Sequence, residues 1–247
     1  MGGRSAEEPL PVLFRDERYV AVNKPAGLLL HRSPMDSRET RFLVQILRNQ
    51  IGQRVFPVHR LDKPTQGVVI FALDTEAAAE LQALFQDTRV EKEYLAVVRG
   101  HLREAVTVDH PLSDPDELRS PVLRDAVTRI LPRATMELPY PVRPYETARY
   151  SLVECRPATG RRHQIRRHLK HLRHPIVGDA NYGDGPHNRL FRDELRLPGL
   201  LLAATRLAFA HPFSREPLNI DAPILSPLRE ALQLPAWRRA AESDHSP

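Results

Sequence analysis

Residues 59–73 read HRLDKPTQGVVIFAL. The last seven positions form a continuous apolar run that follows turn-forming residues, and this pattern predicts a strand buried on both faces. Asp62 therefore lies in a turn that leads directly into the protein core. From the residues alone, the ordinary interpretation of Asp62 is an Asx turn, in which its side chain bonds to the backbone near Thr65. On that interpretation the turn has only a structural role.

Strand patterns and isolated helical patterns alternate irregularly along the rest of the chain. Strands are predicted at 12–14, 19–22, 92–99, 147–154 and 200–209, and helices at 40–51, after 74–75, at 162–174 and at 224–232. The proline-rich segment 106–147 predicts long hairpin loops inside one domain, with a β-like piece at 126–130. Because this order lacks regular βαβ repeats, it predicts an α+β fold around a mainly antiparallel sheet.

The composition is that of an ordinary globular protein. With 247 residues the chain can bury a core, and we expect one domain over residues 11–235 with tails at 1–10 and 236–247. No window approaches the roughly 18 consecutive apolar residues of a membrane span, the N-terminus lacks a signal-peptide pattern, and Cys155 is the only cysteine. We therefore expect a cytoplasmic protein without membrane contacts, and a monomer. The net charge of +5 favours a polyanionic partner.

Several segments together resemble one enzyme family. HRLDKPTQG is similar to the H-R-L-D-x-x-T-S-G signature of the RluA family of pseudouridine synthases. The other motifs of that family have counterparts in the same order: NKPAG at 23–27, KEYLAVVRG at 92–100, TGRRHQIRRH at 159–168 and HPIVGD at 174–179. The resemblance implies a pseudouridine synthase fold, in which helices and long loops flank a curved, mainly antiparallel mixed sheet with a central catalytic cleft. It also implies an enzyme that isomerises uridine in RNA without a cofactor, which agrees with the lack of a nucleotide-binding fingerprint.

The resemblance also implies roles for five residues. Asp62 is the covalent catalyst, acting on the sugar or on the pyrimidine ring. Arg166 is its ion-pair partner, and an arginine beside a carboxylate favours the ionised form. The target uridine must leave the RNA stack, so the remaining roles concern the flipped base: Arg60 fills the vacated space, Tyr94 lies against the base, and Ile165 forms the apolar floor. The ordinary interpretations are phosphate binding for Arg166 and a core aromatic for Tyr94.

The segment 161–174 is strongly basic and contains no acidic residue. Its cations recur at helical spacing, and such an unpaired basic face predicts contacts with RNA phosphates. The residues assigned to this face are Arg162, Arg167, Lys170 and Arg173. The histidines of the segment match no recognised set of metal ligands, so we expect no metal.

The RNA substrate is the least determined feature. Within the family, the sequences of segments 50–53 and 166–174 are most similar to those of members that modify tRNA. This resemblance implies that the target is uridine 65 in the T-arm stem. Ribosomal RNA is the alternative substrate. Two departures from the family pattern, Gln66 in place of serine and Ala203 in place of histidine, favour a different alternative, a non-catalytic RNA-binding factor on the same fold.

Overall fold

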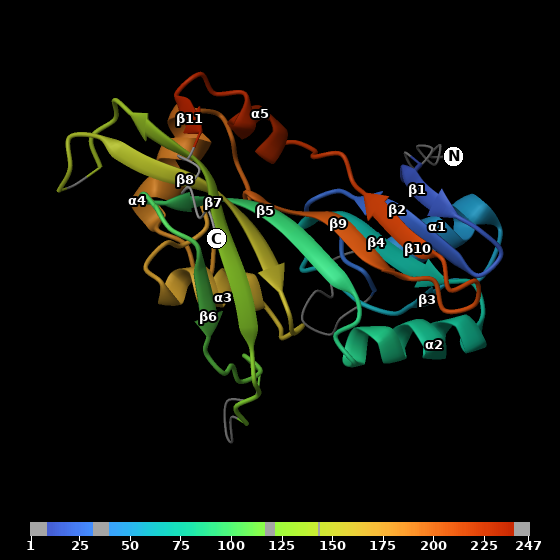
Figure 1. Cartoon of the computed structure of the whole chain (residues 1–247). Helices are drawn as coiled ribbons and strands as arrows, with labels where there is room; N and C mark the ends of the chain where they lie inside the picture. The colour runs from blue at the N-terminus through green and yellow to red at the C-terminus, as the bar shows by residue number, and fades with distance from the viewer. Residues whose placement is uncertain (1–8, 32–39, 117–121, 143, 240–247) are drawn as a thin grey trace, which may run out of the picture. The chain divides into compact units, whose positions relative to one another are not determined.

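The computed structural model describes residues 9–31, 40–116, 122–142 and 144–239. Its contacts group into two compact units, one comprising the chain up to Glu91 with Ala204–Pro223, the other comprising Lys92–Ala203 with the chain from Ile224 onward. Both units combine mainly antiparallel strands with a few helices, which confirms the predicted α+β class (Figure 1). The single domain expected over residues 11–235 stays a prediction. No helix in the described ranges is long and apolar enough to cross a membrane.

The first unit is built around the strand that follows Asp62. Its strands are β1 (Val12–Arg15), β2 (Tyr19–Lys24), β3 (Phe56–Pro57), β4 (Gln66–Ala72), β10 (Pro217–Asp221) and, from Ala204 onward, β9 (Leu202–Ala210). They pair in the order β1-β2-β4-β9, with β10 on β9 and β3 on β4. Every residue of β2 and β4 is buried, so the predicted two-sided burial of this segment is confirmed.

Gly67 explains how β4 can lie so close to β9. Its φ is +118°, and a Cβ at this position would lie 2.0 Å from the Ala204 carbonyl oxygen. Glycine has no Cβ to clash with this carbonyl, and it is the only residue that adopts this φ without a steric penalty. The glycine that ends the HRLDKPTQG motif therefore fixes the packing of the strand that Asp62 precedes.

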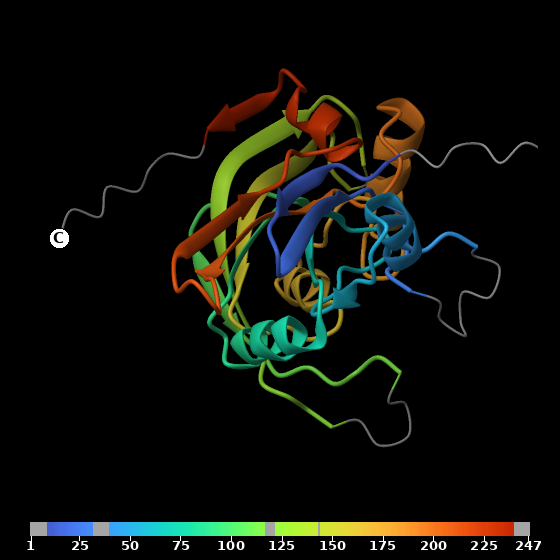
Figure 2. The same cartoon turned by 90° about the vertical axis from the view of Figure 1, so that its right-hand side faces the viewer.

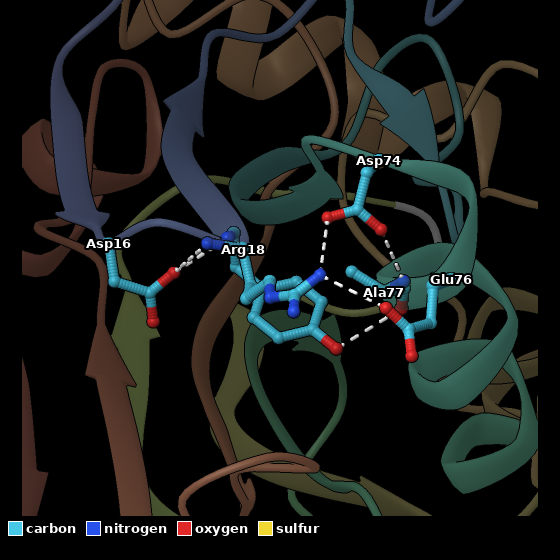
Figure 3. A network of polar contacts seen from close by, with 6 residues as sticks. Asp16, Arg18, Asp74, Glu76 and Ala77 are labelled. Carbon is cyan, nitrogen blue, oxygen red and sulfur yellow. Dashed lines mark hydrogen bonds and ion pairs between the residues drawn. The ribbon is translucent and has the colours of Figure 1, made fainter.

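The two helices of the first unit are α1 (Leu43–Ile51) and α2 (Thr75–Gln86). The helix predicted after 74–75 is α2, and Asp74 caps it, since its side chain accepts a hydrogen bond of 2.8 Å from the Ala77 N–H. Figure 3 shows how the same carboxylate joins α2 to the β1–β2 turn, because Arg18 Nη1 donates to Asp74 at 3.0 Å and to Glu76 at 3.1 Å. The Tyr19 hydroxyl adds a bond of 3.1 Å to the Ala77 carbonyl. Strand β2 is thus anchored at its start, which helps to fix the position of Lys24 at its end.

The proline-rich segment 106–147 belongs to the second unit. The prediction of loops is wrong for 106–109 and 131–138, which lie in strands, whereas the β-like piece predicted at 126–130 coincides with the start of one. The strands of this unit are β5 (Glu91–Arg99, from Lys92 onward), β6 (Val106–Asp109), β7 (Val127–Leu138), β8 (Ala148–Pro157) and β11 (Trp237–Arg239). They pair antiparallel in the order β5-β8-β7-β11, with β6 on β7. Pro132 is tolerated in β7 because the register shifts between Pro132 and Ala134, and such a bulge does not need every N–H. Both views show β7 curving along its length (Figures 1 and 2).

Helices cover both faces of these strands. Alternate residues enter two cores, as expected for a pleated strand: Ala96 and Val98 pack in a cluster with Ile165 and Leu169 of α3 (Gln164–His171), whereas Val97 packs in the other cluster. The second cluster takes side chains from α5 (Leu228–Leu232) and from the single turn at Leu190–Glu194, which follows α4 (Gly185–Arg189). The helices predicted at 162–174 and 224–232 therefore exist but are shorter.

Both expected tails contain described residues that are ordered. Leu10 is buried, and its N–H and carbonyl form hydrogen bonds of 2.8 and 2.9 Å with the side chain of Gln50. At the other end, β11 lies within the expected tail at 236–247 and pairs with β7. The remaining parts of the tails, 1–8 and 240–247, lie outside the described residues.

Candidate active site

Asp62 lies in the connection between β3 and β4 of the first unit. The turn is closed by the Asp62 backbone carbonyl, which accepts a hydrogen bond of 3.0 Å from the Thr65 N–H. Leu61 and Thr65 are buried on either side, while the Asp62 side chain is half-buried and Arg60 is exposed. A backbone hydrogen bond therefore closes the turn, and the carboxylate is carried by a loop whose neighbours are fixed in the core.

His59 fixes the start of this loop. Its Nε2 accepts a hydrogen bond of 3.0 Å from the Ile70 N–H of β4, so Nε2 carries no proton. The ring stacks on Phe85 of α2 with centroids 4.6 Å apart. The histidine that begins the motif thus acts on the backbone and on packing.

Lys24 supports the Asp62 turn from inside the protein. Its side chain is fully buried, and Nζ donates to the carbonyls of Thr65 at 2.7 Å and of Lys63 and Pro25 at 3.0 Å. The Lys63 carbonyl also accepts the Gly27 N–H at 2.8 Å. These bonds explain why the NKPAG and HRLDKPTQG segments occur together, because the first holds the backbone of the second.

The charges of Lys24 and Asp62 are coupled. Burial lowers the pKa of Lys24 to about 7, and the Asp62 carboxylate opposes this shift by stabilising the ammonium. Three carbonyl acceptors also require three N–H hydrogens, which only the protonated amine supplies. The site therefore places a buried cation behind the candidate nucleophile.

The second unit carries Arg166, on the first turn of α3. Its guanidinium is buried and forms a two-point contact with Asp179, from Nε to Oδ2 at 2.7 Å and from Nη2 to Oδ1 at 2.8 Å. Burial alone would raise the pKa of Asp179, but the hydrogen bonds and charge of Arg166, with the N–H groups of Tyr182 and Asn181, hold that pKa below its usual value. The orientation of Arg166 is thus set within this unit by a buried carboxylate.

Gln164 fixes the segment that precedes α3. Its Nε2 donates to the Val127 carbonyl at 3.0 Å and to Thr128 Oγ1 at 2.9 Å. Its Oε1 accepts from Thr159 Oγ1 at 2.7 Å and from the Arg161 N–H at 2.9 Å. One buried amide therefore ties the TGRRHQ turn to β7, and this anchors the start of the helix that carries Arg166.

Two further candidates lie together in the second unit. Ile165 is buried in the cluster that lies under α3, and Tyr94 of β5 packs against the same cluster. The structure therefore places both side chains at one apolar cluster, while their roles at the flipped base stay a prediction.

The predicted phosphate-binding face differs from expectation in two ways. First, α3 begins at Gln164 and ends at His171, so Arg162 and Arg173 lie outside the helix. Left-handed residues flank it on both sides, His163 with a φ of 55° and Arg173 with a φ of 63°. The helical spacing assumed for the cations at 162, 166, 170 and 173 therefore holds only for Arg166 and Lys170.

Second, the expectation that these cations lack acidic partners is wrong for Arg162. Arg162 Nη1 contacts Asp114 at 3.4 Å and forms a short ion pair with Asp116. Arg167 Nη1 donates to the Ser113 carbonyl at 2.5 Å. The partners of Arg162 and Arg167 come from the β6–β7 connection, distant in sequence. Within the predicted set, Lys170 and Arg173 are exposed.

The histidines of this segment contact protein groups. His168 is buried between Thr128 Oγ1 at 2.9 Å and the His110 carbonyl at 3.0 Å, and His174 Nδ1 lies 2.8 Å from the Arg99 carbonyl. His171 stacks on His110 with centroids 4.1 Å apart. Among the described residues, no group of three or more His, Cys, Asp or Glu is arranged to hold a metal ion.

Comparison with known proteins places this arrangement in a family. The sequence profile described as RNA pseudouridylate synthase matches residues 18–171, which include Asp62, Tyr94 and the whole of α3. The chain belongs to the RNA pseudouridylate synthase family.

Named members of this family are similar over nearly their full length. The tRNA pseudouridine synthase C of Vibrio parahaemolyticus is 48% identical over 222 residues, covering 87% of this chain and 90% of that protein. The protein of the same name from Vibrio cholerae is 49% identical over 220 residues, with 86% and 90% covered. The Salmonella typhimurium protein of that name is 43% identical over 236 residues, with 93% and 91% covered.

Solved structures of RNA pseudouridylate synthase domains share the fold. Human RNA pseudouridylate synthase domain containing 1 superposes with a TM-score of 0.70 at 26% identity, covering 97% of this chain and 91% of that one. Human RNA pseudouridylate synthase domain containing 4 gives 0.68 at 26% identity, with 92% and 94% covered. The pseudouridine synthase fold implied by the sequence is thereby confirmed.

The two departures from the family pattern lie in buried positions. Gln66 is fully buried at the start of β4, next to Gly67. Ala203 is buried in the apolar cluster of the second unit that contains Val97 and Tyr150. The surroundings of Ala203 are therefore suited to a small apolar side chain.

Three residues with structural importance for this pseudouridylate synthase site were given no role by the sequence. Lys24 and Asp179 belong to two of the family motifs. The sequence alone does not show that Lys24 is buried beside the Asp62 turn or that Asp179 is buried beside Arg166. Tyr182 follows the last motif and had no signal of its own. A lysine that directly ends an apolar strand, as Lys24 does, was the one available indication.

Proposed function

We propose that the chain is a tRNA pseudouridine synthase that converts uridine 65 of the T-arm stem to pseudouridine, with Asp62 as the catalytic carboxylate. Family membership supports the reaction, and relatives between 43% and 49% identical that are named tRNA pseudouridine synthase C support the RNA class. The observation that carries the assignment of Asp62 is its turn, because a buried ammonium binds the carbonyls of Lys63 and Thr65 just beyond the carboxylate. A carboxylate on such a braced turn is preorganised for attack.

The reaction breaks the N1–C1′ glycosidic bond of uridine and forms a C5–C1′ bond. Asp62 acts as a nucleophile at the sugar or at the pyrimidine ring and is released when the new bond is complete. The C5 hydrogen leaves to solvent and N1 gains a proton, so the product is an isomer of the substrate. A single carboxylate can perform these steps, and no cofactor is part of the proposal.

Arg166 is proposed to pair with Asp62. Asp179 holds the guanidinium through Nε and Nη2, and this fixed orientation supports the proposed pairing. An arginine paired with Asp62 would keep the carboxylate ionised and fix its direction.

The remaining predicted residues contact RNA. Tyr94 and Ile165 are assigned to the flipped uracil, since they pack against one apolar cluster. Arg60 is exposed beside Asp62 and is assigned to the space that the base leaves. The phosphate contacts are assigned to Arg162, Arg167, Lys170 and Arg173. We place the reaction in the cytoplasm and expect a monomer that folds as one domain.

The test is tritium release from tRNA labelled with 5-³H-uridine, because this label leaves only when C5 becomes the glycosidic carbon. Wild-type protein should release it, and Asp62→Asn should not, while both bind tRNA equally. Asp87→Asn is the matched control, since Asp87 is an exposed carboxylate of the same unit paired with Arg89. It should retain full activity.

Two further substrates separate the finer assignments. A tRNA transcript with cytidine at position 65 should release no label if this uridine is the target. Total ribosomal RNA tests the alternative substrate. Failure of the wild-type protein on both tRNA and ribosomal RNA, with RNA binding intact, would favour the non-catalytic RNA-binding factor.

A further inference from the structure

Tyr182 lies in the turn that follows Asp179 in the second unit, and its ring is partly buried beside α3. The centroid of the ring is 5.1 Å from Arg166 Cζ and 5.8 Å from Lys170 Nζ. The hydroxyl lies 2.9 Å from Nδ1 of His163, the residue directly before α3. One side chain therefore contacts the residue before the helix and lies near two of the helix's cations, the buried Arg166 and the exposed Lys170.

The backbone of this turn is held firmly. Asp179 Oδ1 accepts the N–H groups of Asn181 at 2.9 Å and Tyr182 at 3.0 Å, and the Asp179 carbonyl accepts the Gly183 N–H at 3.1 Å. The Asn188 side chain adds a bond of 2.8 Å to the same carbonyl. The carboxylate that binds Arg166 thus also fixes the backbone of Tyr182.

Arg166 is in this way held from two directions. Asp179 binds one edge of the guanidinium in its plane, but two parallel hydrogen bonds do not by themselves prevent the group from tilting. The Tyr182 ring lies against the guanidinium carbon, and an aromatic ring attracts a cation placed against it. Edge and ring contacts together define the position of the group more closely than either alone.

The ring also offsets an unfavourable pairing on α3. Arg166 and Lys170 are four residues apart, and like charges at this spacing repel each other on a helix. Tyr182 lies within reach of both cations. At the helix start, its hydroxyl stabilises His163, whose left-handed φ of 55° is unfavourable for a residue with a side chain.

We propose that Tyr182 is a positioning residue for Arg166: its ring holds the guanidinium, and its hydroxyl, through His163, sets the first turn of α3. The inference rests on the proposed function, in which Arg166 pairs with the catalytic carboxylate. It assigns Tyr182 a part in the rate of the reaction, without contact to the substrate.

The test compares Tyr182→Phe, which keeps the ring, with Tyr182→Leu, which removes both ring and hydroxyl. The single-turnover rate of tritium release at saturating tRNA should fall at least about tenfold in Tyr182→Leu, because small misplacements of catalytic groups are costly. The Kd for tRNA should change less than about twofold, since Tyr182 is not assigned to RNA contacts, and Tyr182→Phe should recover most of the rate. The matched control is Tyr150→Phe, which removes a similar hydroxyl contact, 2.8 Å from His187 Nδ1, in the same unit. Its rate should equal that of the wild type.

A double-mutant cycle distinguishes positioning from general stability. If Tyr182 acts through Arg166, the loss caused by Tyr182→Leu should largely disappear in an Arg166→Lys background. An equal loss in both backgrounds, or a Tyr182→Leu rate equal to the wild type, would overturn the inference. An inactive wild-type protein would instead refute the proposed function, so the two failures are distinguishable.

Discussion

Lys24 Nζ donates a hydrogen bond of 2.7 Å to the carbonyl of Thr65, three residues beyond Asp62. The ammonium is fully buried, and the Asp62 carboxylate is the charged neighbour that stabilises it. Burying a lysine normally costs stability through desolvation. Here the same group donates hydrogen bonds to three backbone carbonyls at the turn. These bonds offset part of the cost of burial and fix the loop that carries the candidate nucleophile.

Lys24→Met should therefore destabilise the protein and slow the reaction. Methionine fills a similar volume but removes the Nζ donor from three carbonyls, of which that of Lys63 keeps the Gly27 N–H. An unsatisfied buried carbonyl costs about 1–3 kcal/mol. Relief of the desolvation cost offsets part of this loss, so we expect the free energy of unfolding to fall by about 2–4 kcal/mol. Urea unfolding and single-turnover tritium release measure the two effects. Lys170→Met, on an exposed lysine, is the control and should leave stability unchanged.

Lys24 should also make stability depend on pH in an alkaline window. Its folded pKa of about 7 lies below the ordinary pKa of 10.5 for an unburied lysine. Between these values the unfolded chain binds the proton more strongly than the folded protein, so the free energy of unfolding contributed by Lys24 rises with pH. The difference between wild type and Lys24→Met should therefore grow in favour of the wild type from about pH 7 to pH 10.5. A difference that stays constant across this window would contradict the prediction.

Asp179→Asn should reduce both the stability of the protein and the rate of the reaction, because Asp179 stabilises the second unit and also orients Arg166. Removing one partner of a buried ion pair costs about 3–5 kcal/mol, and Arg166 would also lose its orientation. We expect lower stability together with a single-turnover rate reduced more than Tyr182→Leu reduces it. The folded pKa of Asp179 is lowered, so its contribution is present above its unfolded pKa and is lost as pH falls through the folded value. The stability difference between wild type and variant should accordingly shrink in acid. Asp193→Asn, on an exposed carboxylate beside Arg192, should change neither quantity.

The features predicted well from sequence are those set by local pattern. The apolar run after Asp62 is short and bounded by turn residues, which favours a buried strand, and the position of Asp74 suits a helix cap because a cap involves only the next three residues. The order of motifs also led to the family, since each is a continuous segment. These signals do not depend on contacts between residues that are distant in the sequence.

The features that were missed depend on contacts between distant segments. Arg162 appeared unpaired because its acidic partners, Asp114 and Asp116, lie far earlier in the chain. β7 was predicted only as a β-like piece at 126–130, because proline normally ends a strand, and the bulge that accommodates Pro132 is visible only against β8. The predicted helix at 162–174 was too long because the left-handed residue His163 forms its boundary, and the enrichment of histidine in that conformation is too small to mark a boundary in a segment with four histidines.

Neutralising the partners of Arg162 should strengthen RNA binding. Asp114 and Asp116 occupy the guanidinium in the free protein, and a phosphate assigned to Arg162 must compete with these carboxylates. In the double variant Asp114→Asn and Asp116→Asn, the phosphate does not have to displace these carboxylates from Arg162, so the Kd for tRNA should fall. The slope of log Kd against log salt concentration should steepen by less than the value of about 0.7–0.9 for one phosphate contact, because Arg162 engages its phosphate more fully. Arg162→Ala should have the opposite effect on both quantities.

The control for this prediction is Glu137→Gln, which removes a carboxylate that contacts Arg149 on the same unit. It changes the net charge by one without freeing an arginine of the predicted RNA face. If the control tightens binding and steepens the salt dependence half as much as the double variant, the effect is that of net charge alone. If the double variant acts well beyond twice the control, and Arg162→Ala abolishes that excess, the carboxylates of the β6–β7 connection restrain Arg162 until RNA replaces them.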